Sequence, residues 1–522
     1  MEQKIGFLHC FCEKAIKYIA LVLLVFVTIL AIAFQSSISL DVFELSTINI
    51  NGIKFYAVFI LSLAALVCLV RLLSRISEQY LFWGFTIIYF VIGTFMIANM
   101  EVTSRYDPTI CYINAWYYSQ GEFMNLGFGD YFYKNPHQLG IVTYNWLWML
   151  FSKEIDIIFV TNLVWIIVTN FVIWQTMKLL YPEKEIVRKI AILLLFGFLP
   201  HFLYLFYAYG QVPGLGGLAL TLYFTVRYMK KKNWVSLLLS FAALGFACMV
   251  RQNYVIAGIA VVLIYFMKVV EKKQLKYVAA IVGVLCSILL PGKLVNAFYE
   301  HVGETDLSNG MPAVLYAAMG LQEPMENYRA AGWYNAYNDL TYMENHCDTT
   351  LCTQIALDSI KSRLDTFVRN PTYAVGFFGE KLITTWCEPT FQCIWSGPNI
   401  PLDSRTEIPI LHDLYSGGIS FQLLSSVMNI ISVWIYLFTA MFIIWKIAVN
   451  KETLNAVELF SMLFFVGGFL FHLVWETKSQ YVYPYVVMLI PLAANGIWLY
   501  YSFVKSKIAK MISGKNSMLY KR

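Results

Sequence analysis

Charged residues are scarce in this sequence. Only 13% of the 522 residues are Asp, Glu, Lys or Arg, whereas 59% are hydrophobic, and a soluble domain usually carries about 25% charged residues. Long apolar runs such as YIALVLLVFVTILAIAF and YAVFILSLAALVCLV recur along the chain, and each approaches the roughly 20 residues that cross a bilayer core. The composition excludes an ordinary soluble protein and predicts an all-α polytopic membrane protein.

The sequence also lacks the motifs of several enzyme classes. It contains no P-loop, no Rossmann glycine fingerprint and no HExxH zinc motif. No DxD-type acidic pair follows the fifth predicted span, where the sequence reads YAYGQVPGLGG. We therefore expect a metal-independent reaction that needs no cofactor. The net charge of +6 does not indicate a nucleic-acid partner, because the basic residues cluster in short loops between apolar runs.

About twelve transmembrane helices are expected. The spans are predicted near residues 17–34, 54–71, 81–99, 156–178, 187–208, 212–229, 234–250, 254–270, 276–292, 421–445, 457–474 and 481–503. The first run is long and has no clear small-residue cleavage site, so it is interpreted as a span and not as a signal peptide. The apolar segment 139–151 is about 13 residues long, which is short for a span and suits an interfacial helix.

The basic residues predict the orientation of the chain. If segment 139–151 is interfacial and the N-terminus is cytoplasmic, the clusters of Lys and Arg fall in inner loops, as the positive-inside rule requires. If that segment crossed the membrane, the run Lys230–Lys232 would lie outside. We therefore predict cytoplasmic N- and C-termini. The chain is divided into residues 1–99 with spans 1–3, an extracytoplasmic juxtamembrane segment 100–154 with two short helices, residues 155–292 with spans 4–9, a large extracytoplasmic loop 293–420, and residues 421–522 with spans 10–12 and a basic tail.

Four of the ten cysteines fall in the large outer loop. Disulfides persist outside the cytoplasm, and Cys347–Cys352 and Cys387–Cys393 are close enough in sequence to form local pairs. Pairing between the two sets is the alternative. Zinc binding also competes, but no histidine stands at finger-like spacing.

The stretch TSRYDPTICYINAWYYSQGEFMNLGFGDYFYKNPHQLG, residues 103–140, is polar and rich in tyrosine. Asp107 follows the third predicted span, so it is expected near the outer membrane surface. One interpretation makes it the N-cap of a short helix with Pro108 at the first helical position. The functional interpretation makes it a general base that deprotonates an incoming hydroxyl.

Other outer segments bring cations, acids and aromatic side chains to the same face. Arg251 is a lone cation between two spans, where it suits a lipid phosphate or anchors the helix at the interface. The aromatic residues near 131–138 form either an interfacial belt or a sugar-binding loop. The predicted donor-binding residues are Tyr106, Asp130, Tyr133, Lys134, His137, Gln138, Arg251, Lys381, Trp386, Glu388, Glu476, Lys478, Gln480 and Tyr481.

Together these features resemble the glycosyltransferase-C superfamily, most closely the branch of protein O-mannosyltransferases and lipid A aminoarabinose transferases and their relatives in Gram-positive bacteria. The resemblance rests on Asp107 followed by TICYINAWYYSQGE, on KNPHQLGIVTYNWLW with Lys134, Pro136 and His137, and on SQYVYP at residues 479–484. Three departures stand out. Two spans precede the one that leads to Asp107, where many relatives have one; His137 replaces a second proline; and Gln480 stands where an arginine is common.

The resemblance implies a polyprenyl-phosphate-linked monosaccharide as donor, used on the outer face of the cell membrane. Asp107 would take the proton of the acceptor hydroxyl as it attacks the anomeric carbon. Arg251 and neighbouring lysines would hold the charge of the departing lipid phosphate, and a single displacement would invert the anomeric centre. The acceptor would be a cell-envelope glycan, teichoic acid, lipid or protein, recognised by the outer loop.

Three other functions stay open at the level of sequence. An O-antigen-like ligase or polymerase would be expected to use several outer arginines, and the large loop contains Arg329, Arg363, Arg369 and Arg405. A lipid-linked glycan flippase or transporter would place polar groups at the bilayer midplane, whereas the predicted span interiors are almost free of charge. A non-catalytic scaffold would tolerate Asp107→Asn.

Overall fold

The computed structural model describes residues 2–40, 44–308, 310–324, 329–398, 408–449 and 453–519, with the backbone alone at 2–9 and 512–519. Arg405, considered above, lies outside the described residues. The first helices are α1 (Glu2–Ala33), α2 (Ile53–Leu73), α3 (Glu78–Asn99), α4 (Tyr106–Tyr118), α5 (Tyr131–Lys134), α6 (Leu139–Met149), α7 (Asp156–Leu180), α8 (Glu185–Gly197), α9 (Leu199–Leu203), α10 (Gln211–Lys231) and α11 (Trp234–Val250). The later helices are α12 (Val255–Lys272), α13 (Leu275–Val302), α14 (Val314–Gly320), α15 (Tyr337–Glu344), α16 (Thr349–Arg369), α17 (Pro371–Trp386), α18 (Cys393–Ser396), α19 (Pro409–Tyr415), α20 (Ile419–Ala448), α21 (Ala456–Val474) and α22 (Ser479–Leu519). Short 3-10 helices η1 (Pro136–Gln138), η2 (Tyr204–Phe206) and η3 (Gln252–Tyr254) connect some of them.

The all-α polytopic architecture is confirmed. Among the described residues, nine helices are long and apolar enough to span a membrane, and a tenth span results if the bent pair Glu185–Gly197 and Leu199–Phe206 counts as one. The two halves of this pair meet at 47°, where Pro200 near the start of α9 lacks an amide hydrogen and so cannot continue α8. Eleven of the twelve predicted spans coincide with one helix each, whereas the span predicted at 187–208 coincides with α8, α9 and η2. Helix α11 has only 17 residues, and α10 is unbroken but contains Gly214, Gly216 and Gly217. The count of twelve stays a prediction.

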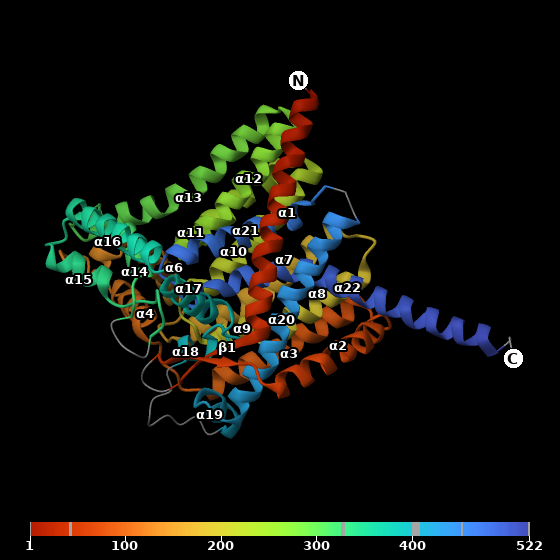
Figure 1. Ribbon diagram of the computed structural model, residues 1–522. Helices are drawn as coiled ribbons and strands as arrows, with labels where there is room; N and C mark the ends of the chain where they lie inside the picture. The colour runs from red at the N-terminus through yellow and green to blue at the C-terminus, as the bar shows by residue number, and fades with distance from the viewer. Residues whose placement is uncertain are drawn as a thin grey trace.

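The long helices form one bundle, and glycine lets several of them approach closely. A Cβ atom at Gly496 of α22 would lie 1.8 Å from the carbonyl oxygen of Phe438 in α20, and one at Gly217 of α10 would lie 3.0 Å from that of Ala243 in α11. Small residues at such crossings are typical of membrane helices, whose packing depends on close backbone contact. Figure 1 shows α1 crossing the bundle and α13 leading from it toward α14, α15 and α16.

The segment between α1 and α2 contains a feature that the sequence interpretation did not include. Strands β1 (Phe34–Ile38) and β2 (Ser46–Ile50) form an antiparallel pair in which Phe34 faces Ile50. The amide of Ser36 in β1 donates to the carbonyl oxygen of Cys387, 2.9 Å away, at the end of α17. This contact ties the hairpin to the 293–420 region and brings Glu44, which precedes β2, toward the start of α22.

The predicted juxtamembrane helices and outer loop have counterparts in the structure. After α3 come α4 and α6, with the single turn of α5 between them. The region predicted as the large loop contains α14–α19, while α13 continues ten residues beyond the predicted boundary at 292, to Val302. The described residues of the 293–420 region are therefore mostly helical.

The predicted local disulfides are not formed. All ten cysteines are free, and Cys347, Cys352, Cys387 and Cys393 are buried as thiols. The Cys352 thiol lies 3.6 Å from the carbonyl oxygen of Thr341, and Cys347 is 4.0 Å from the sulfur of Met343. Cys347 and Cys352 pack in a small core with Leu315 and Tyr342, whereas Cys387 and Cys393 pack in the main core of the bundle. As small apolar side chains they can be buried without a covalent link.

Candidate active site

Asp107 lies in the first turn of α4 and is not the helix cap. The N-cap is Arg105, and the helix begins at Tyr106, so the interpretation of Asp107 as N-cap was wrong. Tyr106 has φ of +48°, a left-handed conformation that is strained for an aromatic residue and commonly costs about 1–3 kcal/mol. The backbone therefore bends sharply just before Asp107, whose side chain remains accessible.

The surroundings of Asp107 raise its pKa. Desolvation by the enclosing protein is the main cause, and a hydrogen bond donated by the Tyr131 hydroxyl and the charges of Lys478 and Arg251 oppose it. Tyr131 comes from α5, Lys478 from the connection between α21 and α22, and Arg251 from the connection between α11 and α12. Four separate segments of the chain thus converge on one accessible carboxyl group.

Arg251 is held between two tyrosine rings. Its guanidinium carbon lies 4.7 Å from the centroid of the Tyr209 ring and 5.3 Å from that of Tyr481. A Cβ atom at Gly210 would lie 1.9 Å from the carbonyl oxygen of Val250, so only glycine lets the segment before α10 approach Arg251 this closely. Stacking on tyrosine fixes the plane of the guanidinium and leaves its N–H groups for an anion.

Lys478 is oriented by an ion pair with Glu44. Its ammonium group lies 2.6 Å from Glu44 Oε2, and both side chains are largely buried. Gln392 donates a second hydrogen bond to Glu44, at 3.1 Å. Lys478 also lies over the ring of Trp333, 5.6 Å from its centroid. A cation beside Asp107 is therefore fixed by residues from three distant parts of the sequence.

The connection that carries Glu476 and Lys478 is anchored on both sides. The amide of Glu476 donates to Tyr316 of α14 at 3.1 Å. Lys381 is fully buried and donates to the carbonyl oxygens of Gly320 and, at 2.9 Å, of Trp475. Burial lowers the pKa of Lys381 to about 7, against the charge of Glu476. Lys381 thus stabilises this connection through backbone carbonyl groups.

Tyr481 and Gln480 line the same region at the start of α22. The Tyr481 hydroxyl donates to Glu476 Oε1 at 3.1 Å, and Gln480 Oε1 accepts from Tyr207 at 3.1 Å and from Ser396 at 2.8 Å. Burial raises the pKa of Glu476, and the charge of Lys478 and the hydrogen bond from Tyr481 oppose this shift. We call the set Asp107, Tyr131, Tyr209, Arg251, Glu476, Lys478 and Tyr481 the Asp107 cluster.

His137 adjoins the cluster as a neutral imidazole. Its ring is accessible, yet the surrounding protein and the charge of Arg251 lower its pKa to about 4. At neutral pH it can donate or accept a hydrogen bond but carries no charge. Its ring centroid lies 6.4 Å from that of Tyr316.

Several predicted donor-binding residues have structural partners elsewhere. Lys134 pairs with Asp339 at 2.6 Å, and Tyr133 packs in a separate core with Leu315 and Tyr342. Asp130 precedes α5 and accepts from the amide of Gly127 at 2.8 Å.

The two predicted residues at the end of α17 have structural surroundings as well. Trp386 is buried and stacks on Phe469 at 5.8 Å. Glu388 accepts hydrogen bonds from Thr390, Gln392 and Ser479. Gln138 directly precedes α6, and Tyr106 is exposed next to Asp107.

The structure adds residues that sequence reasoning missed. Glu44 lies between two predicted spans, and Tyr207 and Tyr209 lie at the end of another, so none of the three was predicted as a site residue. Tyr131 belongs to the aromatic stretch near 131–138 but was not predicted to bind the donor. A signal was present for two of them, because Tyr207 and Tyr209 precede the glycine in YAYGQVP. Within the described residues, no group of three or more His, Cys, Asp or Glu side chains is placed to hold a metal ion.

Comparison with known proteins supports the resemblance. Residues 143–291 match the family described as dolichyl-phosphate-mannose-protein mannosyltransferase. This region extends from within α6 into α13 and includes Tyr209 and Arg251 but not Asp107. No curated protein matches the chain. The resemblance to the glycosyltransferase-C superfamily is thereby confirmed, and the match supports a multi-pass, polyprenyl-phosphate-sugar-dependent membrane glycosyltransferase in general.

Proposed function

On the premise of a glycosyltransferase-C enzyme, we propose that this chain transfers one monosaccharide from a polyprenyl-phosphate donor to a hydroxyl group of a cell-envelope acceptor. The acceptor is a glycan, teichoic acid, lipid or protein. The reaction takes place on the extracytoplasmic face, inverts the anomeric configuration and proceeds without a metal ion. The observation that carries the proposal is an accessible carboxyl group, Asp107, beside two fixed cations.

Asp107 acts as the general base. Desolvation raises the pKa of its carboxyl group, which makes the carboxylate a stronger base than an ordinary aspartate. Asp107 takes the proton of the acceptor hydroxyl while the oxygen forms a bond to the anomeric carbon. The bond from that carbon to the phosphate oxygen breaks on the opposite side, and its electron pair leaves with the polyprenyl phosphate.

Arg251 and Lys478 stabilise the leaving phosphate. Negative charge develops on the phosphate as the bond breaks, and fixed cations at that position lower the barrier most because they need not reorganise. Tyr209 and Tyr481 hold the guanidinium of Arg251, and Glu44 holds the ammonium group of Lys478. The arginine that is common in relatives near the last span is replaced by Gln480, and Arg251 takes its role.

The charge pattern supports the extracytoplasmic side. Arg251 precedes α12, which ends at Lys272, and α10 likewise begins beside the Asp107 cluster and ends in the run Lys230–Lys232. The lysine-rich ends of membrane helices tend to face the cytoplasm. The Asp107 cluster, at the opposite ends of the same helices, is therefore assigned to the outer face, where α14–α19 are available to recognise the acceptor.

A transfer assay tests the proposal. Purified full-length protein is incubated with a panel of radiolabelled polyprenyl-phosphate monosaccharides and cell-envelope acceptors, with EDTA present. We expect transfer by the wild type and a decrease of about 10²–10⁴-fold for Asp107→Asn, the range that a general base contributes. Asp358→Asn is the matched control. Asp358 is exposed on α16 and accepts a hydrogen bond from Gln354, one turn earlier in the same helix.

Three results would contradict parts of this function. Equal transfer by the wild type and Asp107→Asn would show that Asp107 is not the general base. Loss of wild-type activity in EDTA would show that the reaction needs a metal ion. Transfer from a diphosphate-linked glycan in place of the monophosphate donors would favour the ligase or polymerase function.

A further inference from the structure

A cavity lies at the ends of α10 and α12 that are far from the Asp107 cluster. Its volume is about 270 Å³, and its polar lining includes Lys230, Lys232, Lys268 and Lys272. Helix α10 has 21 residues between the segment of Tyr209 and these lysines, which at 1.5 Å per residue separates the two places by roughly 30 Å. The cavity therefore does not belong to the site described above.

Among the described residues that line this cavity, lysines outnumber acids. The described acids of the lining are Glu13 and Glu271. Glu271 lies 2.5 Å from Lys268. Glu13 is paired with Lys17 at 2.7 Å, and it also accepts from the amide of Leu454 at 2.8 Å. The described lining therefore carries an excess of positive charge.

Two of the lysines make contacts with neutral groups that an anion can replace. Lys230 donates to the carbonyl oxygen of Leu179, and Lys232 donates to that of Met229 at 2.6 Å and to the Tyr277 hydroxyl at 3.2 Å. Hydrogen bonds from an ammonium group to an anionic oxygen are stronger than those to a neutral oxygen. Lys230 and Lys232 are exposed, so their ammonium groups can turn to a ligand without crossing the protein interior.

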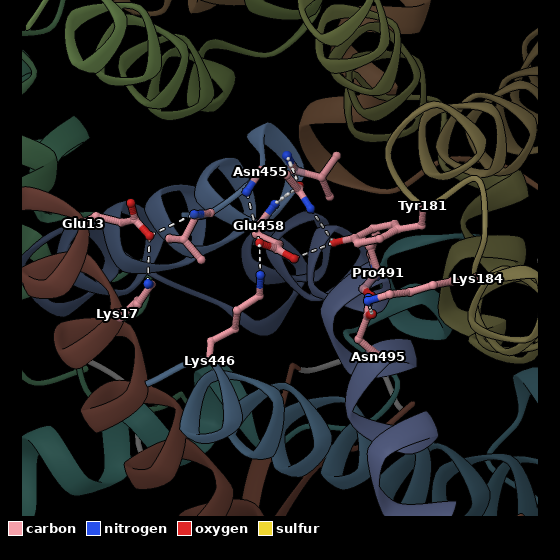
Figure 2. A network of polar contacts seen from close by, with 11 residues as sticks. Glu13, Lys17, Tyr181, Lys184, Lys446, Asn455, Glu458, Pro491 and Asn495 are labelled. Atoms are coloured by element: carbon pink, nitrogen blue, oxygen red, sulfur yellow. Dashed lines mark hydrogen bonds and ion pairs between the residues drawn. The ribbon is translucent and has the colours of Figure 1, made fainter. Parts of the chain in front are cut away.

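One wall of the cavity is held by a buried polar network (Figure 2). The Asn455 side chain caps α21 by accepting from the amides of Val457 and Glu458, and it donates to the Tyr181 hydroxyl at 2.9 Å. Glu458 accepts from Tyr181 at 2.9 Å and pairs with Lys446 at 3.1 Å. These contacts join α7, α20 and α21, and they give the cavity a wall that is set by the fold.

Much of the remaining lining is apolar. It includes Met229, Ile264 and Met267, of which Ile264 and Met267 are buried. Lys272 is the last residue of the span Gln252–Lys272, so the cavity opens where a membrane helix reaches the surface of the bilayer. Basic pockets between helices at this depth bind anionic lipid headgroups.

We propose that this cavity binds the phosphate of an anionic membrane lipid, with the lysines around the phosphate and the apolar lining against the adjoining glycerol and acyl carbons. A free phosphate ester shares the anionic group but has no part that would occupy the apolar lining. The lipid is therefore the better ligand for this site. The proposal is independent of the donor lipid, which the Asp107 cluster would bind at the other ends of the same helices.

Native mass spectrometry of the delipidated full-length protein tests this site. Phosphatidylglycerol and phosphatidylcholine with the same acyl chains are titrated in parallel, and the stepwise binding constants are compared. We expect one phosphatidylglycerol to bind more tightly than phosphatidylcholine. Lys230→Gln with Lys272→Gln should weaken this step by on the order of 30-fold.

The matched control is Lys231→Gln with Lys273→Gln. These lysines are the sequence neighbours of the first pair, are exposed, and do not line the cavity, so the change in net charge is the same. Equal weakening by both double variants would overturn the proposal, because it would reduce the effect to general surface charge. Displacement of the lipid by millimolar glycerol phosphate or inorganic phosphate would overturn it in favour of a soluble phosphate ester.

One comparison needs no variant and covers the case in which the double substitution prevents folding. Equal affinities of the wild type for phosphatidylglycerol and phosphatidylcholine would by themselves overturn the proposal. A preference for phosphatidylglycerol that weakens as salt is raised would support it, because screening reduces the attraction between lysines and phosphate.

Discussion

The two ends of α10 and α12 carry the same kinds of charged side chains but arrange them differently. At one end, the Asp107 cluster places an accessible carboxyl group beside Arg251 and Lys478, and aromatic rings or an ion pair fix each cation. At the other end, lysines surround a cavity, and the buried acid Glu458 is bound to Lys446, Tyr181 and Asn455.

The difference shows what separates a reactive arrangement from a binding or structural one. A base needs a carboxyl group that substrate can reach and whose pKa is raised by its surroundings, as for Asp107. Glu458 is only 1% exposed and its oxygens are occupied by internal donors, so it can stabilise helix packing but cannot take a proton from an external ligand. Access, more than residue type, distinguishes the two ends.

Among the residues that surround Asp107, the largest effect is expected for Arg251→Gln. This change keeps some hydrogen-bonding capacity but removes the charge between Tyr209 and Tyr481, so kcat/KM for sugar transfer should fall by about 10²–10³-fold. Arg251→Lys should recover part of the loss, because it restores charge without the planar stacking. Arg369→Gln, on the exposed face of α16, is the control in the same transfer assay. Wild-type rates in Arg251→Gln would show that the charge of Arg251 does not contribute to sugar transfer.

Lys446→Met should affect the stability of the fold and leave the chemistry unchanged. It leaves Glu458 buried without its cation, which typically destabilises a protein by about 3–5 kcal/mol. Thermal unfolding in detergent should show a lower Tm, with unchanged kcat/KM per folded molecule. Lys505→Met, at an exposed position of α22, is the control. Loss of transfer at full folding would mean that both ends contribute to catalysis, which would break the comparison.

Glu44→Gln should reduce kcat/KM by about 10-fold. Glutamine can still accept from Gln392, but it no longer holds the ammonium group of Lys478 by charge, and a misplaced group at a reaction centre is costly. The effect is measured in a double-mutant cycle with Lys478→Met. If Glu44 acts by positioning Lys478, its substitution should add little when Lys478 is already replaced. Additive losses would assign Glu44 a separate role.

Among the substitutions in and beside the Asp107 cluster, Tyr131→Phe is expected to have the smallest effect on the rate and the most specific effect on its pH dependence. The Tyr131 hydroxyl donates to Asp107 and lowers its pKa, so its removal should raise that pKa further. The base form is present above the pKa and is lost as the pH falls through it, so the acid limb of the pH profile of kcat/KM should move to higher pH. Tyr112→Phe, whose hydroxyl bonds Lys153 in another part of the chain, should leave the limb in place. If the acid limb of Tyr131→Phe stays at the wild-type pH, a group other than Asp107 determines that limb.

The sequence by itself determined the class of the protein and the helices of the bundle. Apolar runs of bilayer length must form helices, because the backbone in a membrane has no water to bond, and eleven of the twelve predicted spans coincide with a single helix. Asp107 and Arg251 were also predicted as site residues from sequence, since a charge next to the end of a span stands out against an apolar background, and the structure places them near each other. The interfacial helix was expected at 139–151, and α6 is found at Leu139–Met149.

Tertiary structure alone decided which side chains meet. Glu44 and Lys478 are 434 positions apart, and no local pattern relates them; the β1–β2 hairpin and the anchored connection before α22 bring them together. The same packing directs Lys134 to Asp339, encloses Glu388 among internal donors, and leaves the four cysteines of the 293–420 region as separate thiols. Periodicity and hydropathy report the neighbours of a residue along one helix. The partners of Asp107 come from different helices and connections, so only the folded chain defines the site.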